Sequence, residues 1–103
     1  MIGPYPRDQS VRLHDLIYAA KHHERIDPLP VASHRRRLRQ DCGVSQELAA
    51  VAVGASVTAL ARWETSERAP RLAKHDDQYR RVLGALANYV TYKAALSVKA
   101  SGR

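Results

Sequence analysis

The stretch that decides the fold of this chain is QELAAVAVGASVTALARWE, residues 46–64. It predicts two short helices, over 46–53 and from 57 to about 64, because each follows a serine that favours the N-cap position, Ser45 or Ser56. The residues between them begin with Gly54, which tolerates the left-handed backbone of a sharp turn. The second helix can therefore swing across the first at a steep angle.

The apolar residues of this stretch and its neighbours predict a small helical core. Ala49 is small where the two short helices must approach closely, and an apolar seam between them is supplied by Leu48, Val53, Val57, Leu60 and Trp63. We expect Trp63 to belong to the core rather than to stack on bases. The full set of expected core residues is Leu38, Val44, Leu48, Ala49, Val53, Leu60, Trp63, Tyr79 and Leu83.

Further helices are expected on both sides of this pair. Residues 8–25 repeat apolar side chains near a 3.6-residue period, and Asp-Pro-Leu-Pro at 27–30 then interrupts the helix. A helix from 31 to about 42 follows and ends at a glycine, Gly43. Residues 65–70 read as a loop, and the chain is helical again from about residue 75.

The C-terminal segment leaves one alternative open. Gly84 either ends a fifth helix and lets a sixth begin, or lies inside one long helix at a small cost. Nothing alternates with period two, so no sheet is expected. We predict an all-α fold: a compact domain of about five helices, with an extra N-terminal helix and an extended C-terminal helix whose tail frays.

The composition narrows the class of function. With 103 residues, 45% of them apolar, the chain fits one small domain, and its net charge of +7 favours a polyanion such as nucleic acid over an enzyme with a deep pocket. Residues 1–30 carry four basic and four acidic groups, residues 31–71 seven and four, and residues 72–103 six and two. The positive excess therefore begins after the 27–30 break.

The reactive side chains predict neither catalysis nor a cofactor. Cys42 is the one cysteine, which excludes an intramolecular disulfide and a cysteine zinc site, and we expect it to be half-buried and without an activating base. Surface positions are favoured over a metal site for His14, His22, His23 and His75. No signal peptide or membrane-spanning run is seen, so the expected compartment is the cytoplasm of a bacterial host.

Residues 31–86 resemble the lambda repressor-like helix-turn-helix family, which is common among phage repressors and bacterial regulators. The resemblance is carried by Leu38-Arg39, by Gly-Val-Ser-Gln-Glu-Leu-Ala at 43–49, by Arg-Trp-Glu at 62–64 and by Pro70. It divides the chain into an N-terminal arm and amphipathic helix (1–30), the family domain (31–86) and a C-terminal helical extension (87–103).

The resemblance implies that the helix beginning at Val57 enters the major groove of double-stranded DNA, with its N-terminal end towards the bases. The residues that it places against bases are Val57, Thr58, Arg62 and, at the margin, Ala61. Arg62 can donate two hydrogen bonds to guanine, which makes it the main specificity residue. Contacts to the DNA backbone are implied for Gln46, Ser56, Thr65, Ser66, Arg68 and Arg71, with Arg36 and Arg39 as further candidates.

Two arginines of the helix that begins at residue 31, Arg35 and Arg39, have expected structural roles. The resemblance implies that Arg39 pairs with Glu64 between helices, and we favour this structural ion pair over a phosphate contact. Arg35 stands where the family often carries an apolar residue, so we expect its stem to cover the core while its head reaches solvent. Ser66 stands where glycine is frequent, which leaves the shape of that loop open. The basic run 34–39 is either a DNA-facing strip or a solvated face.

The function that follows is sequence-specific transcriptional repression on DNA. Small size and an Arg-rich, Ala-rich, Lys-poor composition typical of high-GC genomes suggest a temperate-phage immunity repressor that blocks a lytic promoter. The alternatives are a Cro-like lytic regulator, the antitoxin of a toxin–antitoxin pair, and a helical interaction adaptor that does not use DNA. We expect a homodimer on a two-fold operator, through residues 79–96 or the N-terminal helix, with a monomer that pairs only on DNA as the rival. No membrane and no small-molecule ligand is implied.

Overall fold

The computed structural model describes residues 11–102, and the side chains of residues 11–95. This part of the chain contains five helices and no strand: α1 (Leu13–His22), α2 (Ala32–Asp41), α3 (Gln46–Val53), α4 (Val57–Trp63) and α5 (Ala73–Gly102). The predicted all-α class is therefore confirmed. None of the described helices is long and apolar enough to span a membrane.

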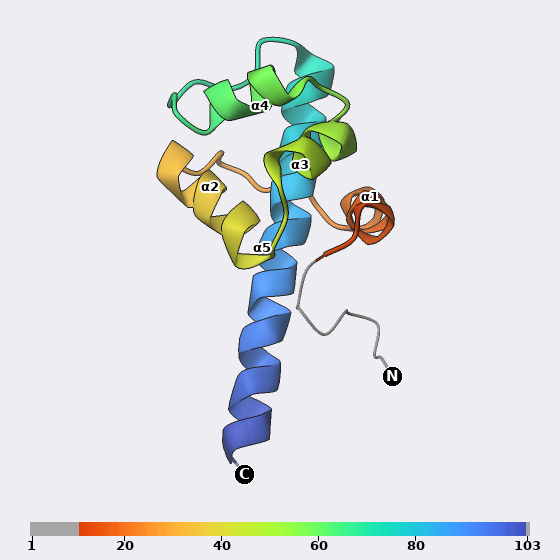
Figure 1. Cartoon of the computed structure of the whole chain (residues 1–103), viewed down its shortest axis with the longest axis vertical. Coiled ribbons are helices and arrows are strands. Elements are labelled where there is room, and N and C mark those ends of the chain that lie inside the picture. The colour runs from red at the N-terminus through yellow and green to blue at the C-terminus, as the bar shows by residue number, and fades with distance from the viewer. Residues whose placement is uncertain (1–10, 103) are drawn as a thin grey trace.

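Helix α5 forms the long axis of the molecule, and the other helices gather around its N-terminal half (Figure 1). It contacts α1, α2 and α3, while α4 packs on α3. Its buried side chains lie along one apolar stripe with helical spacing: Tyr79, Val82, Leu83, Ala85, Leu86 and Tyr89. Lys93 Nζ donates to the carbonyl of Asp41, the last residue of α2, at 3.1 Å, and the part of α5 beyond Lys93 extends away from the other helices (Figure 1).

The turn between α3 and α4 has the predicted geometry. Ser45 Oγ accepts a hydrogen bond from the Leu48 amide at 3.0 Å, and Ser56 Oγ accepts one from the Ala59 amide at 3.1 Å. Both predicted N-caps are thus confirmed. Gly54 caps the end of α3 with φ +85°, the left-handed conformation that glycine adopts without steric cost.

The N-terminal helix is shorter than the predicted 8–25. Helix α1 begins at Leu13, because the chain before it is extended and the Val11 amide donates to the Cys42 carbonyl at 3.1 Å. It ends at His22, and the next residue is extended. Residues 8–10 of the prediction lie outside the described residues.

Gly84 lies inside one continuous α5, which decides between the two alternatives left open above. A glycine is needed at this position because the linker between α1 and α2, residues 23–31, passes close to the helix. A Cβ at residue 84 would lie 2.5 Å from the backbone oxygen of Glu24, far inside van der Waals contact. The Ile26 amide, from the same linker, donates to the Arg80 carbonyl of α5 at 3.0 Å. Glycine therefore allows the linker to lie directly on the helix.

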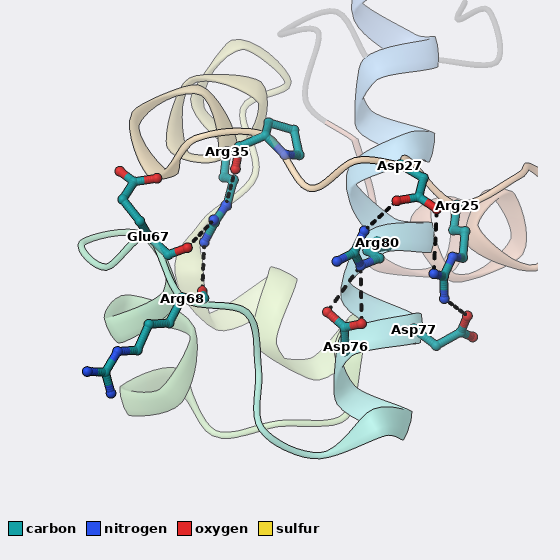
Figure 2. Close-up of polar contacts among 9 residues, drawn as sticks. Arg25, Asp27, Arg35, Glu67, Arg68, Asp76, Asp77 and Arg80 are labelled. Carbon is teal, nitrogen blue, oxygen red and sulfur yellow. Dashed lines mark hydrogen bonds and ion pairs between the residues drawn. The ribbon is translucent and has the colours of Figure 1, made fainter.

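Ion pairs fasten this linker to α5 (Figure 2). Arg80 pairs with Asp27 at 2.9 Å and with Asp76 at 3.1 Å, and Arg25 pairs with Asp77 at 2.9 Å. Arg81 also binds Asp77, and the hydrogen bonds from Arg81 and Arg25 hold the pKa of Asp77 below its ordinary value. Part of the basic excess of residues 72–103 is thus used within the fold.

Cys42 is fully buried rather than half-buried as expected. It lies just beyond α2 against α5, where its Sγ donates to the Leu86 carbonyl at 3.5 Å. Burial raises the pKa of Cys42 to about 12, so the group is a neutral thiol at physiological pH.

Candidate nucleic-acid interface

Helix α4 presents one face to the core and the other to solvent. On the core face Leu60 is fully buried. On the other face Val57 is 39% exposed, and Thr58 and Arg62 are exposed as well. Ala61 is half-buried. The structure therefore leaves accessible the three side chains that the resemblance implies as the main contacts to bases.

A buried carboxylate fixes the end of α4. Glu64 is only 4% exposed, and its two oxygens accept from Arg39 Nε at 2.6 Å and from Arg39 Nη2 at 2.9 Å. Gln46 Nε2 also donates to it, at 3.0 Å, and Arg39 Nη1 donates to the Val44 carbonyl at 2.9 Å. Arg39 and Gln46 are thus held to Glu64, and this cluster joins α2, α3 and α4.

Most of the candidate residues for contacts to the DNA backbone are exposed or lie in the loop after α4. Arg36, Arg68 and Arg71 are exposed, and so is Ser56. The hydroxyls of two further candidates bind their own loop: Thr65 Oγ1 donates to the Arg62 carbonyl at 3.2 Å, and Ser66 Oγ accepts from the Arg68 amide at 3.2 Å.

A surface hollow of about 590 Å³ lies between α4 and the start of α5. Three basic side chains of the candidate interface line it, together with apolar and small residues: Arg62, Arg68, Arg71, Trp63, Leu72, His75, Ala59, Ser66 and Ala69. Trp63 is half-buried, and its ring lies 5.0 Å from that of Tyr79. The hollow is open and positively charged, which suits a phosphate backbone.

Arg35 corrects an expectation. Its head does not reach solvent: the residue is 2% exposed, and its guanidinium donates to backbone carbonyls. The acceptors belong to Pro30, Trp63, Ser66, Glu67 and Arg68. One signal in the sequence pointed to this burial. Residue 35 lies at helical spacing from Ala32 and Leu38, which are both buried.

The core beneath the interface contains the expected apolar residues. Seven of the nine are buried, and Leu48 and Trp63 pack against them while partly exposed. The buried seven are Leu38, Val44, Ala49, Val53, Leu60, Tyr79 and Leu83. The Tyr79 hydroxyl is buried without a hydrogen bond of normal geometry among the described residues, and burial raises the pKa of Tyr79 against the opposing effect of the nearby Arg35 guanidinium. Within the same part of the chain, no group of His, Cys, Asp and Glu side chains has the arrangement of a metal site.

Comparison with known proteins identifies the segment that contains α3, α4 and the loop after α4. Residues 36–74 match the model of the helix-turn-helix family, from within α2 to the start of α5. That family is one of DNA-binding transcription regulators. No curated protein and no solved structure matches the chain. The match therefore covers the frame around α3 and α4, and leaves α1 and most of α5 outside.

Proposed function

We propose that this chain is a sequence-specific transcriptional repressor that places α4 in the major groove of DNA. The observation that carries the proposal is the two-sidedness of α4. Leu60 and Glu64 hold the helix to the core, while Val57, Thr58 and Arg62 remain accessible. A reading helix needs this combination, because its orientation must be fixed while its outer side chains stay free to meet base edges.

Each accessible residue has a chemical role in this proposal. Arg62 donates two hydrogen bonds to O6 and N7 of a guanine, a contact that discriminates against the wrong base by roughly 1–3 kcal/mol. Val57 and the methyl group of Thr58 pack against a thymine methyl, and Ala61 adds a marginal contact. Specificity therefore rests mainly on Arg62.

The backbone contacts are assigned to residues around α4. Arg68, Arg71 and Ser66, which line the basic hollow, follow the phosphates. Thr65 and Ser56 contribute further contacts, and Arg36 contributes from α2. These contacts fix the register and supply the salt-dependent part of the affinity. Arg39 and Gln46 act chiefly by holding Glu64.

The finer proposal is a temperate-phage immunity repressor that occupies an operator and excludes RNA polymerase from a lytic promoter. Its support is the Arg-rich, Lys-poor composition. The family match of residues 36–74 supports the coarser role of a DNA-binding regulator. A dimer on a two-fold site would set two reading helices about 34–36 Å apart. Within residues 79–96, Tyr79, Leu83, Leu86 and Tyr89 are buried in the protomer, so a dimer must use other side chains.

The test compares two DNA duplexes, the promoter region of the chain's own operon and a mixed-sequence control, at several salt concentrations. A specific repressor prefers its own site by roughly 10³-fold or more. A footprint on the preferred duplex then reports the length and symmetry of the site. Equal affinity for both duplexes overturns the proposal, and co-purification of a toxin would redirect it to the antitoxin class.

A further inference from the structure

The loop that follows α4 is gathered around one buried cation. Arg35 Nη1 donates to the Trp63 carbonyl at 2.8 Å and to the carbonyls of Ser66 and Arg68 at 3.2 Å each, and Nη2 donates to that of Glu67 at 3.3 Å. Nε is bound to the Pro30 carbonyl at 2.6 Å. Figure 2 shows the guanidinium lying against the loop from the side of α2.

These bonds suit the end of a helix and fix the path of the loop. Trp63 is the last residue of α4, and a carbonyl at a helix C-terminus has no partner within the helix and carries partial negative charge, so the contact of its carbonyl with the Arg35 cation is favourable. A guanidinium is a rigid planar fork of donors, and its acceptors must therefore converge on it. In the described part of the chain these acceptors are carbonyls of four loop and helix-end residues rather than one carboxylate.

A second bond from α2 fixes the same loop. Glu67 Oε1 accepts from the amide of Ala32, in the first turn of α2, at 3.0 Å. With the loop carbonyls turned towards Arg35, the side chain of Arg68 is directed away from it, as Figure 2 shows. The exposed Arg68 thus belongs to a segment whose backbone is held at several points.

We propose that Arg35 is the positioning residue for the DNA-backbone contacts of the loop, and that Arg68 reaches a phosphate only while Arg35 holds the loop carbonyls. The inference rests on the proposed function. Arg35 itself is buried and touches no DNA in this account. It acts by presetting the loop, so that Arg68 is placed before DNA arrives rather than ordered at a cost on binding.

The experiment is a double-mutant cycle on binding to a mixed-sequence duplex, which reports backbone contacts alone. Arg68→Ala should weaken wild-type binding about fivefold, as the loss of one phosphate contact. In the Arg35→Met background the same change should cost less than about twofold, because the loop no longer presents Arg68. Arg36→Ala is the matched control: Arg36 is exposed on α2 outside the loop, so its effect should be equal in both backgrounds.

The cycle separates positioning from general stability. All variants are measured at a temperature where each is folded, and a merely structural Arg35 would leave the Arg68→Ala effect unchanged. That result overturns the inference while leaving the proposed function intact. If Arg35→Met does not fold, the cycle is run with Arg35→Lys, which keeps a charge but lacks the planar fork, and the same loss of coupling is expected. Failure of the wild type to bind any duplex overturns the proposed function and the inference with it.

Discussion

Glu64, at the end of α4, receives two hydrogen bonds from Arg39 of α2, at 2.6 and 2.9 Å. The carboxylate is almost wholly buried, and Gln46 at the start of α3 donates to it as well. This cluster therefore fixes how the end of α4 lies against α2 and α3. Removal of the Glu64 carboxylate should therefore lower the stability of the fold, and any loss of DNA affinity should follow from that.

Glu64→Ala should destabilise the chain by about 3–5 kcal/mol, because it leaves the Arg39 guanidinium, whose side chain is only 12% exposed, without its partner. Urea unfolding followed by circular dichroism measures the loss. Glu24→Ala is the matched control, since Glu24 is an exposed carboxylate in the α1–α2 linker, and it should stay within about 0.5 kcal/mol of wild type. A Glu64→Ala variant as stable as this control would show that the ion pair contributes little.

Gly84→Ala should destabilise the chain although alanine is the better helix former by about 1 kcal/mol. The added Cβ would meet the Glu24 carbonyl oxygen at 2.5 Å, and both groups are backbone or fixed to it, so the linker must move off α5. Thermal unfolding measures the effect. Thr91→Ala, at an exposed position on the same helix, should change stability little. A rise in the melting temperature of Gly84→Ala would contradict the close packing of the linker.

Tyr79→Phe should leave stability unchanged or raise it by up to about 1 kcal/mol. The change keeps the ring that packs on Trp63 and removes a buried hydroxyl that has no hydrogen bond of normal geometry among the described residues. Tyr18→Phe, at a side chain 61% exposed, serves as the control. Destabilisation by more than about 1 kcal/mol would mean that the Tyr79 hydroxyl is satisfied in solution.

Cys42 should resist alkylation by iodoacetamide in the folded chain at pH 8 and react readily in urea. Its pKa is raised to about 12 by burial, so the thiolate is scarce in the native state. The unfolded thiol ionises near pH 8.5, and the native one does not until about pH 12. The thiol's contribution to stability is therefore complete below about pH 8.5 and is lost as the pH rises towards 12. Rapid native alkylation at pH 8 would contradict the burial.

Short-range sequence signals predicted the turn between α3 and α4. The start of α1 and the role of Gly84 depend on contacts between residues far apart in the sequence. Ser45, Gly54 and Ser56 act on their own neighbours, and their roles could be predicted from their positions alone. The start of α1 could not, because the Val11 amide pairs with the carbonyl of Cys42, far along the chain. The close approach of the α1–α2 linker to Gly84 could not be predicted for the same reason.

The residues of the candidate site also fall into those that the sequence predicted and those that it did not. Resemblance to a family supplied the Arg39–Glu64 pair and the outward residues of α4. The spacing of Arg35 from Ala32 and Leu38 indicates a buried position, but its acceptors are backbone carbonyls, which the sequence does not reveal, and its head was therefore wrongly expected in solvent. Composition predicted an anionic partner, and the structure shows that part of the positive charge, Arg80 and Arg81, is used in ion pairs within the fold.

The most direct test of the account is the ratio of dissociation constants for a mixed-sequence duplex and for the chain's own operator, measured for the wild type, Arg62→Ala and Arg68→Ala. The wild-type ratio should be roughly 10³ or more. Arg62→Ala should lower it by about tenfold or more, as expected for the loss of a bidentate contact to guanine. Arg68→Ala should weaken both duplexes alike and leave the ratio unchanged. A ratio that Arg62→Ala does not alter would contradict the placement of α4 in the major groove.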